Sequence, residues 1–381
     1  MEESENKSTA PKLSETPTGG SISRAPVSFK MTFLVADKSV PIPPRQEEWQ
    51  DTRPDVTLEL LRVPGASGQP DHAALCAKKA GQLSHDVHDA LAELASGKLP
   101  VGSNLELVKN QVDASGQFKP GFAAPLAALP DFLQKFCHTI HDELYETGQS
   151  WAQLLRWRLG LTSGQPQALY FKNLEFCMDG QSWHPLAQFI RLKIKIGIPE
   201  SSSGITGEVL KSAAELRQQN ESEPISRAMF REAWNLQQGN LRSALMIGYA
   251  AVETGCKEFI GKLVPNAKWL AMEAPTPPLP SILKNYLPTL PVRLTAGGKV
   301  VIPDRLRKAV REAMEARNTL AHSGVLDLTA DQLENILHCF NDVLWLLDLY
   351  GGQRWAWQHL SVQTATEISA AASPSAGESA A

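Results

Sequence analysis

The sequence has few cysteines, and none of them is placed to pair. The five are scattered along the chain without a CxxC motif: Cys76, Cys137, Cys177, Cys256 and Cys339. Such spacing argues against a disulfide framework or a clustered zinc site and is typical of reduced thiols. The sequence also has no Gly-rich phosphate loop, no nucleophile elbow and no HExxH motif, so it predicts neither a metal nor an organic cofactor.

Long hydrophobic runs and a strong excess of positive charge are missing as well. No apolar segment approaches the roughly 20 residues that a membrane span needs. The acidic start, with Glu2, Glu3 and Glu5, is unlike a secretory signal. We therefore expect a soluble, cytoplasmic protein that does not bind a membrane. The net charge of −4 means that any nucleic-acid site must be a local basic patch.

The 381 residues are enough for two or three domains, and their patterning predicts an α+β protein with an all-α C-terminal part. The tails are rich in Ser, Pro and Ala and are expected to be disordered. The predicted segments are a disordered tail at 1–26, an α+β region at 27–125, a helix with a β-hairpin and strand at 126–200, a linker at 201–223, a helical bundle at 224–362 and a disordered tail at 363–381.

Period-two alternation marks the strands expected in the first two segments. It is clear at Phe29–Val35 and Val56–Leu60, whereas residues 73–94 have helical spacing and residues 105–112 read as another strand. The Asp179-Gly180 pair predicts a hairpin turn. The region 201–223 reads as a linker or a poorly packed helix.

The most regular alternation occurs at residues 190–198. Arg191, Lys193 and Lys195 share one face of this predicted strand, opposite a row of isoleucine and leucine side chains. Three cations in register could bind RNA phosphates. A solvated sheet face explains the same pattern, and the pattern itself favours this second interpretation.

Four helical patterns follow residue 223, and their apolar stripes predict one bundle. They cover Pro224–Gln238, Asn240–Val264, Pro303–Ala321 and Thr329–Tyr350. Pro303 with Asp304 marks the start of the third helix and Gly324 its end, while Thr329 is expected to cap the fourth.

The third helix breaks its own pattern at Arg317. Apolar residues recur along one face at Leu306, Val310 and Ala313, and the next position on that face is Arg317. Burying an unpaired guanidinium costs several kcal/mol, so a carboxylate, a partner subunit or a phosphate must compensate for it. Sequences tend to break local rules at functional sites.

Arg317 begins the motif Arg317-Asn318-Thr319-Leu320-Ala321-His322, in which a polar residue follows the arginine and a histidine lies five positions on. This motif, with the upstream helix "RSALMIGYAAVETGCKEFI", resembles the signature of HEPN domains, the helical module of many prokaryotic RNases. The resemblance covers about the last 140 residues. Arg354 and His359 have the same spacing, but Arg354 follows the glycines that end the fourth helix and precedes Trp355 instead of a polar residue.

The resemblance implies a metal-independent endoribonuclease of a bacterial toxin or antiviral-defence type. By resemblance, His322 is the acid/base, Arg317 stabilises the transition state and Asn318 orients the histidine or the phosphate. Because family members pair two motifs in one cleft, it also implies a homodimer through the helix that carries Arg317, and an antitoxin or regulatory partner fits such a role.

Two points remain open at the level of sequence. Glu253 is a candidate polar partner of Arg317, although Lys257 four residues later predicts an exposed ion pair. The alternative function is a catalytically silent HEPN module for dimerisation, nucleotide binding or partner binding, and a nucleotidyltransferase partner is a third possibility.

Overall fold

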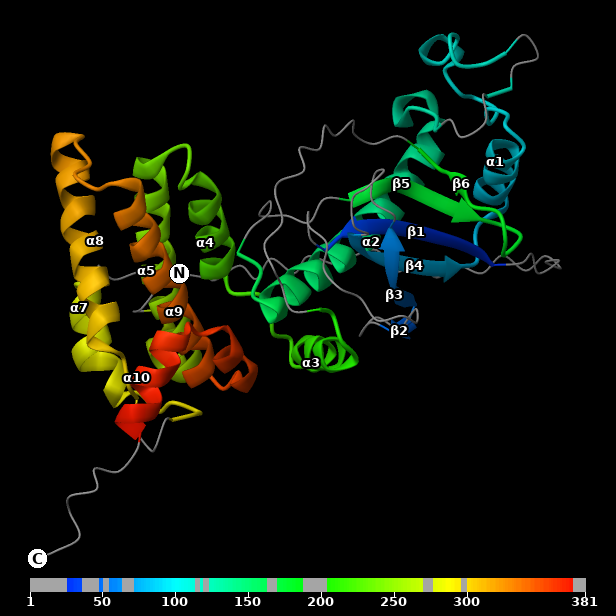
Figure 1. Cartoon of the computed structure of the whole chain (residues 1–381). Coiled ribbons are helices and arrows are strands. Elements are labelled where there is room, and N and C mark those ends of the chain that lie inside the picture. Colours follow the sequence, from blue (N-terminus) through cyan, green and yellow to red (C-terminus); the bar gives the residue numbers. More distant parts are fainter. Residues whose placement is uncertain are drawn as a thin grey trace, which may run out of the picture.

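The structure, a computed structural model, has two lobes joined by the helices α2 (Asp131–Leu159) and α3 (Gly207–Gln218) (Figure 1). A β-sheet lies in one lobe and a helical bundle in the other, which confirms the predicted α+β class. The structure describes residues 26–35, 48–50, 55–63, 72–113, 117–118, 123–162, 170–187, 204–269, 277–295 and 300–372. In these ranges no helix has the length and hydropathy of a membrane span.

The first lobe contains an antiparallel sheet with the strand order β2-β3-β4-β1-β5-β6. Alternation along the central strand β1 explains its burial, because Phe29, Met31 and Phe33 all point into the core. The strands are β1 (Val27–Leu34), β2 (Glu48–Gln50), β3 (Val56–Val63), β4 (His72–Gly81), β5 (Tyr170–Cys177) and β6 (His184–Pro185). The predicted hairpin at Asp179-Gly180 is confirmed, since β5 pairs with β6.

Helix α2 covers this sheet. Its buried residues recur at helical spacing, at Leu133, Cys137, Ile140 and Leu144, and they share one core with β1 and β4. Gly148 allows the closest approach, because a Cβ at this position would overlap the Phe33 ring. The smaller elements of this lobe are α1 (His85–Ala95), η1 (Leu105–Leu107) and η2 (Leu126–Ala128).

The bundle is built around α5 and α9, which contact each other and both contact α4 and α8. Gly248 and Gly255 of α5 bring the two together, because a Cβ at either would press on Leu337 or Leu344 of α9. The elements are α4 (Ile225–Leu236), α5 (Leu241–Leu263), η3 (Pro265–Ala267), α7 (Leu279–Ser281), η4 (Ile282–Tyr286), η5 (Leu287–Thr289), α8 (Asp304–Ser323), α9 (Ala330–Tyr350), η6 (Arg354–His359) and α10 (Val362–Ala372).

The two lobes meet where α2 ends against α9 and η6. The indole Nε1 of Trp157 donates a hydrogen bond to Asp348 Oδ2 at 2.9 Å, and the Trp157 ring packs edge-to-face on Trp355 with centroids 5.1 Å apart. Nε2 of His359 lies 2.9 Å from the carbonyl oxygen of Arg158. We call these contacts the interlobe joint.

Several predicted segments are wrong. Residues 73–81 belong to β4 because they pair with β1 and β3 on either side. The strand expected at 105–112 is a 3-10 turn capped by Asn104. The region 201–223, interpreted as a linker or a poorly packed helix, contains the helix α3, and the apolar face of α3 is buried. The tail expected from residue 363 contains α10, in which Thr364 and Ile368 are buried.

Candidate functional site

Helix α8 carries the residues that the sequence singled out. It starts after Pro303, and Gly324, with a φ of 70°, ends it in the left-handed conformation that glycine adopts without strain. Leu306, Val310 and Ala313 are buried along its inner face. Arg317 is the next residue on this face and is half-buried, so its guanidinium lies at the edge of the bundle core.

The surroundings of Arg317 are polar on one side and aromatic on the other. Its Nη1 donates a hydrogen bond to Asn318 Oδ1 at 3.2 Å, and its guanidinium carbon lies 5.8 Å from the centre of the Tyr249 ring on α5. Among the residues that the structure describes, no carboxylate forms an ion pair with Arg317. Glu253 instead pairs with Lys257 on its own helix at 3.5 Å, as the sequence predicted.

Tyr249 is a residue that the sequence reasoning missed. Its ring is almost fully buried and packs edge-to-face on Phe340 of α9, with centroids 6.4 Å apart. Burial and the nearby Glu253 raise the pKa of the Tyr249 phenol, while Arg317 opposes this effect. The only available signal was a tyrosine one helical turn before Glu253, which does not distinguish a site residue from a core residue. We call Tyr249, Arg317 and Asn318 the α5–α8 edge.

His322 lies in the last turn of α8 and is exposed. Five residues along an α-helix correspond to a rotation of about 140° beyond a full turn. The side chains of Arg317 and His322 therefore leave the helix in different directions. Within the described ranges His322 has no hydrogen bond, and none joins it to Arg317.

The remaining sequence candidates fall into two groups. Arg191, Lys193 and Lys195 lie outside the described residues. His359 belongs to the interlobe joint, whereas Arg354 is exposed. His359 stacks on Trp345 with centroids 4.6 Å apart, and burial lowers the pKa of its imidazole to about 4.

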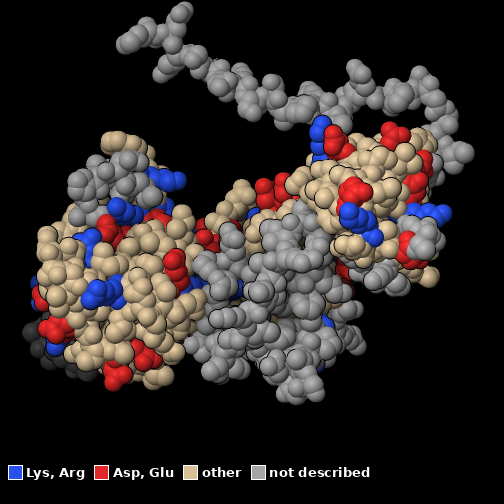
Figure 2. Space-filling view, turned by 90° about the horizontal axis from the view of Figure 1, so that it is seen from above, with Lys and Arg blue, Asp and Glu red and all other residues tan. Residues whose placement is uncertain are grey.

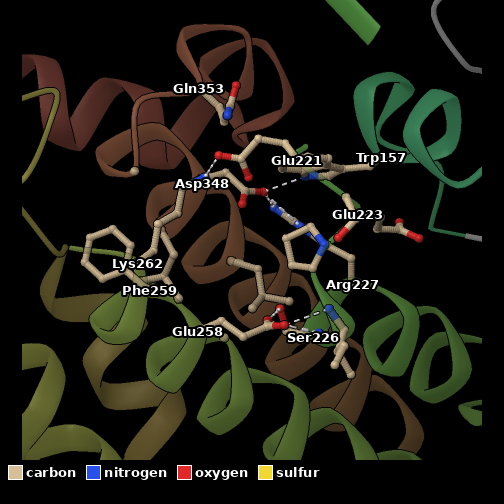
Figure 3. A pocket seen from close by; sticks show the side chains of 17 residues that line it. Trp157, Glu221, Glu223, Ser226, Arg227, Glu258, Phe259, Lys262, Asp348 and Gln353 are labelled. Carbon is tan, nitrogen blue, oxygen red and sulfur yellow. Dashed lines mark hydrogen bonds and ion pairs between the residues drawn. The ribbon is translucent and has the colours of Figure 1, made fainter. Parts of the chain in front are cut away.

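A pocket of about 270 Å³ is lined by residues of the interlobe joint and of the start of α4 (Figure 3). Many charged side chains line it, and they pair with one another. Arg227 donates from Nη2 to Asp348 Oδ2 at 2.7 Å and lies 3.3 Å above the Trp345 ring. Lys262 and Glu221 are 2.6 Å apart.

Two further carboxylates of this pocket are also satisfied. Glu223 pairs with the buried Arg231 behind the pocket wall. Glu258 accepts hydrogen bonds from the backbone N–H of Ile225 at 2.8 Å and from the hydroxyl of Ser226 at 2.7 Å, so it caps the start of α4. The charged side chains described in this pocket therefore form ion pairs and hydrogen bonds between helices. None of those named here lacks a partner that a ligand could replace.

A wider groove of about 1060 Å³ runs along the outer side of α8 and α9. Arg305 lines it and is held by Thr364 at 2.5 Å and by Cys339 Sγ at 3.1 Å, with Asp342 at 3.5 Å. On the view in Figure 2, basic and acidic side chains are interspersed over the bundle, and neither sign forms a broad field among the described residues. The α5–α8 edge is thus the one place where we find a half-buried cation without a carboxylate in the described part of the bundle.

In the ranges that the structure describes, no three His, Cys, Asp or Glu side chains come together as metal ligands. A scan against protein-family models, a search of curated proteins and a search of solved structures each found no match for this chain.

Proposed function

We propose that the chain is a HEPN-type endoribonuclease that acts as a homodimer and cleaves RNA without a metal ion. The observation that carries this proposal is the half-buried guanidinium of Arg317, which has no carboxylate partner among the described residues. Four other arginines of the bundle are buried or half-buried, and each has one: Arg227, Arg231, Arg305 and Arg307. The charge of Arg317 is therefore available to an anion.

A phosphate group of RNA is the anion that suits this position best. A guanidinium is planar and can bind two phosphate oxygens at once, and it keeps its charge at every physiological pH. A partly buried position strengthens the attraction, because the surrounding dielectric is lower than that of water. Asn318, already bonded to Arg317, supplies an amide group beside the same phosphate.

The proposed reaction needs proton transfer at two oxygens. The 2′-oxygen of the ribose bonds to phosphorus while one histidine takes the 2′-hydroxyl proton. The bond from phosphorus to the 5′-oxygen then breaks while a second histidine donates a proton to that oxygen. The products are a 2′,3′-cyclic phosphate and a 5′-hydroxyl. Histidine is suited to both steps because its ordinary pKa is close to neutral pH.

The direction of the two side chains supports a dimer. Since Arg317 and His322 leave α8 about 140° apart, a phosphate at one arginine is better reached by the histidine of a second copy. An isologous pair through α8 would bring two arginines and two histidines together along one twofold axis. We further propose a cytoplasmic enzyme of a toxin or antiviral-defence type, which an antitoxin or another regulator holds in check.

The test is cleavage of a defined RNA by the purified full-length chain in excess EDTA. We expect His322→Ala to reduce the rate about 10²–10⁴-fold and Arg317→Ala about 10²–10³-fold. His85→Ala, an exposed histidine at the start of α1, and Arg354→Ala are the matched controls and should keep full activity. End-labelling should detect cyclic phosphates on the products.

The alternative is a catalytically silent module that binds nucleotides or a partner. It is favoured by the missing contact between Arg317 and His322 within one chain. Wild-type protein that binds RNA without cleaving it, or a His322→Ala variant as active as the wild type, would establish this alternative. A monomer in light scattering at micromolar concentration, with and without RNA, would contradict the dimer.

A further inference from the structure

Tyr249 lies beside Arg317 and has a hydroxyl that the fold does not use. Only 6% of the residue is exposed, yet no described residue forms a hydrogen bond with its hydroxyl. The hydroxyl is not among the buried polar atoms that lack a partner, so it reaches water at the surface while the ring is buried. The hydroxyl is therefore open to a ligand beside Arg317.

Tyr350 of the same bundle shows the ordinary arrangement. Its hydroxyl donates to the carbonyl oxygen of Val301 at 2.7 Å and accepts from the N–H of the same residue at 2.9 Å. It thus fixes the chain that enters α8 and is fully used inside the fold. The Tyr249 hydroxyl has no such bond among the described residues and reaches water, so it is available to a group from outside them.

The charges around Tyr249 favour an anion as this group. Arg317 lies over the ring at 5.8 Å and is positively charged, while Glu253 is offset by Lys257 at 3.5 Å. Burial and Glu253 also raise the pKa of the phenol, which keeps its proton at neutral pH and makes the hydroxyl a donor. A donor beside an uncompensated guanidinium matches an oxygen-rich anion such as phosphate.

We propose that Tyr249 is a substrate-binding residue, whose hydroxyl donates a hydrogen bond to an oxygen of the phosphate that Arg317 holds. The ring has a second role as a platform that limits the motion of the guanidinium. Phe340 holds this ring in place from the opposite helix. The proposal rests on the proposed function, because the phosphate is that of the RNA substrate.

Two variants separate the hydroxyl from the ring. Tyr249→Phe keeps the ring and removes the donor, and a hydrogen bond to a charged group is worth enough to predict a roughly 10- to 100-fold loss of kcat/KM. Tyr249→Leu removes the platform as well and should cause a larger loss. Tyr286→Phe, an exposed tyrosine on η4, is the matched control and should behave as the wild type.

The same inference can be tested without catalysis. A 2′-O-methylated RNA cannot undergo the attack, so its binding measures recognition alone. We expect Tyr249→Phe to weaken this binding about 10-fold or more. The dependence of affinity on salt should stay unchanged, because the lost contact is uncharged. Arg317→Ala should reduce the salt slope by about one phosphate contact.

A double-mutant cycle distinguishes contact with a shared phosphate from a purely structural role. In the Arg317→Ala background, Tyr249→Phe should have little further effect, because the phosphate is no longer held. Additive effects, or a Tyr249→Phe variant that binds and cleaves as the wild type does, would overturn the inference and leave the ribonuclease proposal intact. A wild-type chain that binds methylated RNA through Tyr249 but never cleaves RNA would overturn only the ribonuclease proposal.

Discussion

The arginines beside the interlobe joint and the arginine of the α5–α8 edge are exposed to water to different degrees and paired in different ways. Arg227 and Arg231 are almost completely buried, and each is bonded to a carboxylate. Arg317 is half-buried and contacts only an amide and an aromatic ring among the described residues. Arg158 at the joint is also buried, and its guanidinium contacts the Ser212 hydroxyl and the Trp355 ring. Arg317 differs from these three arginines in its exposure, because it lies half-buried at the edge of the bundle.

This difference in pairing predicts different effects of substitution on the free energy of unfolding. Removing one partner of a buried pair leaves the other charge without compensation, so a substitution at the joint should destabilise the fold. Removing an uncompensated charge from the edge should leave stability almost unchanged and affect only binding and catalysis. The following predictions are ordered by the expected change in the free energy of unfolding.

The largest effect is expected for Arg231→Met. It leaves the Glu223 carboxylate buried without its cation, and breaking such a pair typically costs about 3–5 kcal/mol. Urea unfolding followed by circular dichroism measures this loss. The double variant Glu223→Gln with Arg231→Met should recover much of it, since no lone charge remains. If Arg231→Met alone were as stable as the wild type, the expected difference in stability between substitutions at Arg231 and at Arg317 would be contradicted.

The second effect concerns pH and His359. The pKa of this imidazole is about 4 in the folded chain against 6.5 ordinarily, so the unfolded chain binds the extra proton first. The neutral imidazole therefore contributes its full share to the free energy of unfolding above pH 6.5. This contribution, up to about 3 kcal/mol, is lost as the pH falls towards 4. Melting curves of the wild type and of His359→Gln should differ in slope across this window. Parallel curves would show that His359 does not titrate as its burial requires.

A smaller effect is expected at the cap of α4. Ser226→Ala removes one of the hydrogen bonds that Glu258 accepts, and losing a helix-capping bond costs about 0.5–2 kcal/mol. Ser323→Ala is the control, because the Ser323 hydroxyl bonds only its own exposed helix end. Equal stability of the two variants would mean that Glu258 holds α4 through the backbone alone.

The smallest effect is expected for Arg317→Ala. Substitutions away from buried networks usually change stability by less than about 0.5 kcal/mol, and here no ion pair among the described residues is lost. The same variant should nevertheless lose cleavage. Chemical denaturation should therefore show a wild-type curve for a catalytically inactive protein. A loss of several kcal/mol would place Arg317 with the joint arginines, as a structural residue.

The bundle could be predicted well because its signals are local. Pro303, Gly324 and Thr329 define helix ends through their own backbone and side chain, and the structure has α8 and α9 where these residues put them. The β4 segment was misread because its alanines fit a helix or a strand, and its pairing with β1 and β3 decides between them. Pairing between strands that are distant in the sequence cannot be predicted from the pattern of a short segment.

The site could be predicted only in part for a related reason. Arg317 stood out because it breaks a pattern within its own helix. Tyr249 did not, because a tyrosine on an apolar face is ordinary, and only the approach of α8 brings it to Arg317. The helical pattern was predicted to reach Ala321, and α8 continues through His322 to Ser323. The direction of a side chain at a helix end depends on where the cap falls.

The bond between Trp157 and Asp348 has a consequence for how the chain unfolds. Oδ2 of Asp348 accepts from Arg227 of the bundle and from Trp157 of the other lobe, at 2.7 and 2.9 Å. If the sheet lobe melted alone, this buried oxygen would lose one donor and the cluster of tryptophans would be opened to water. Each lobe therefore supports the other, and heat should melt them in one cooperative transition instead of two. Trp157 fluorescence and far-ultraviolet circular dichroism should then report the same midpoint.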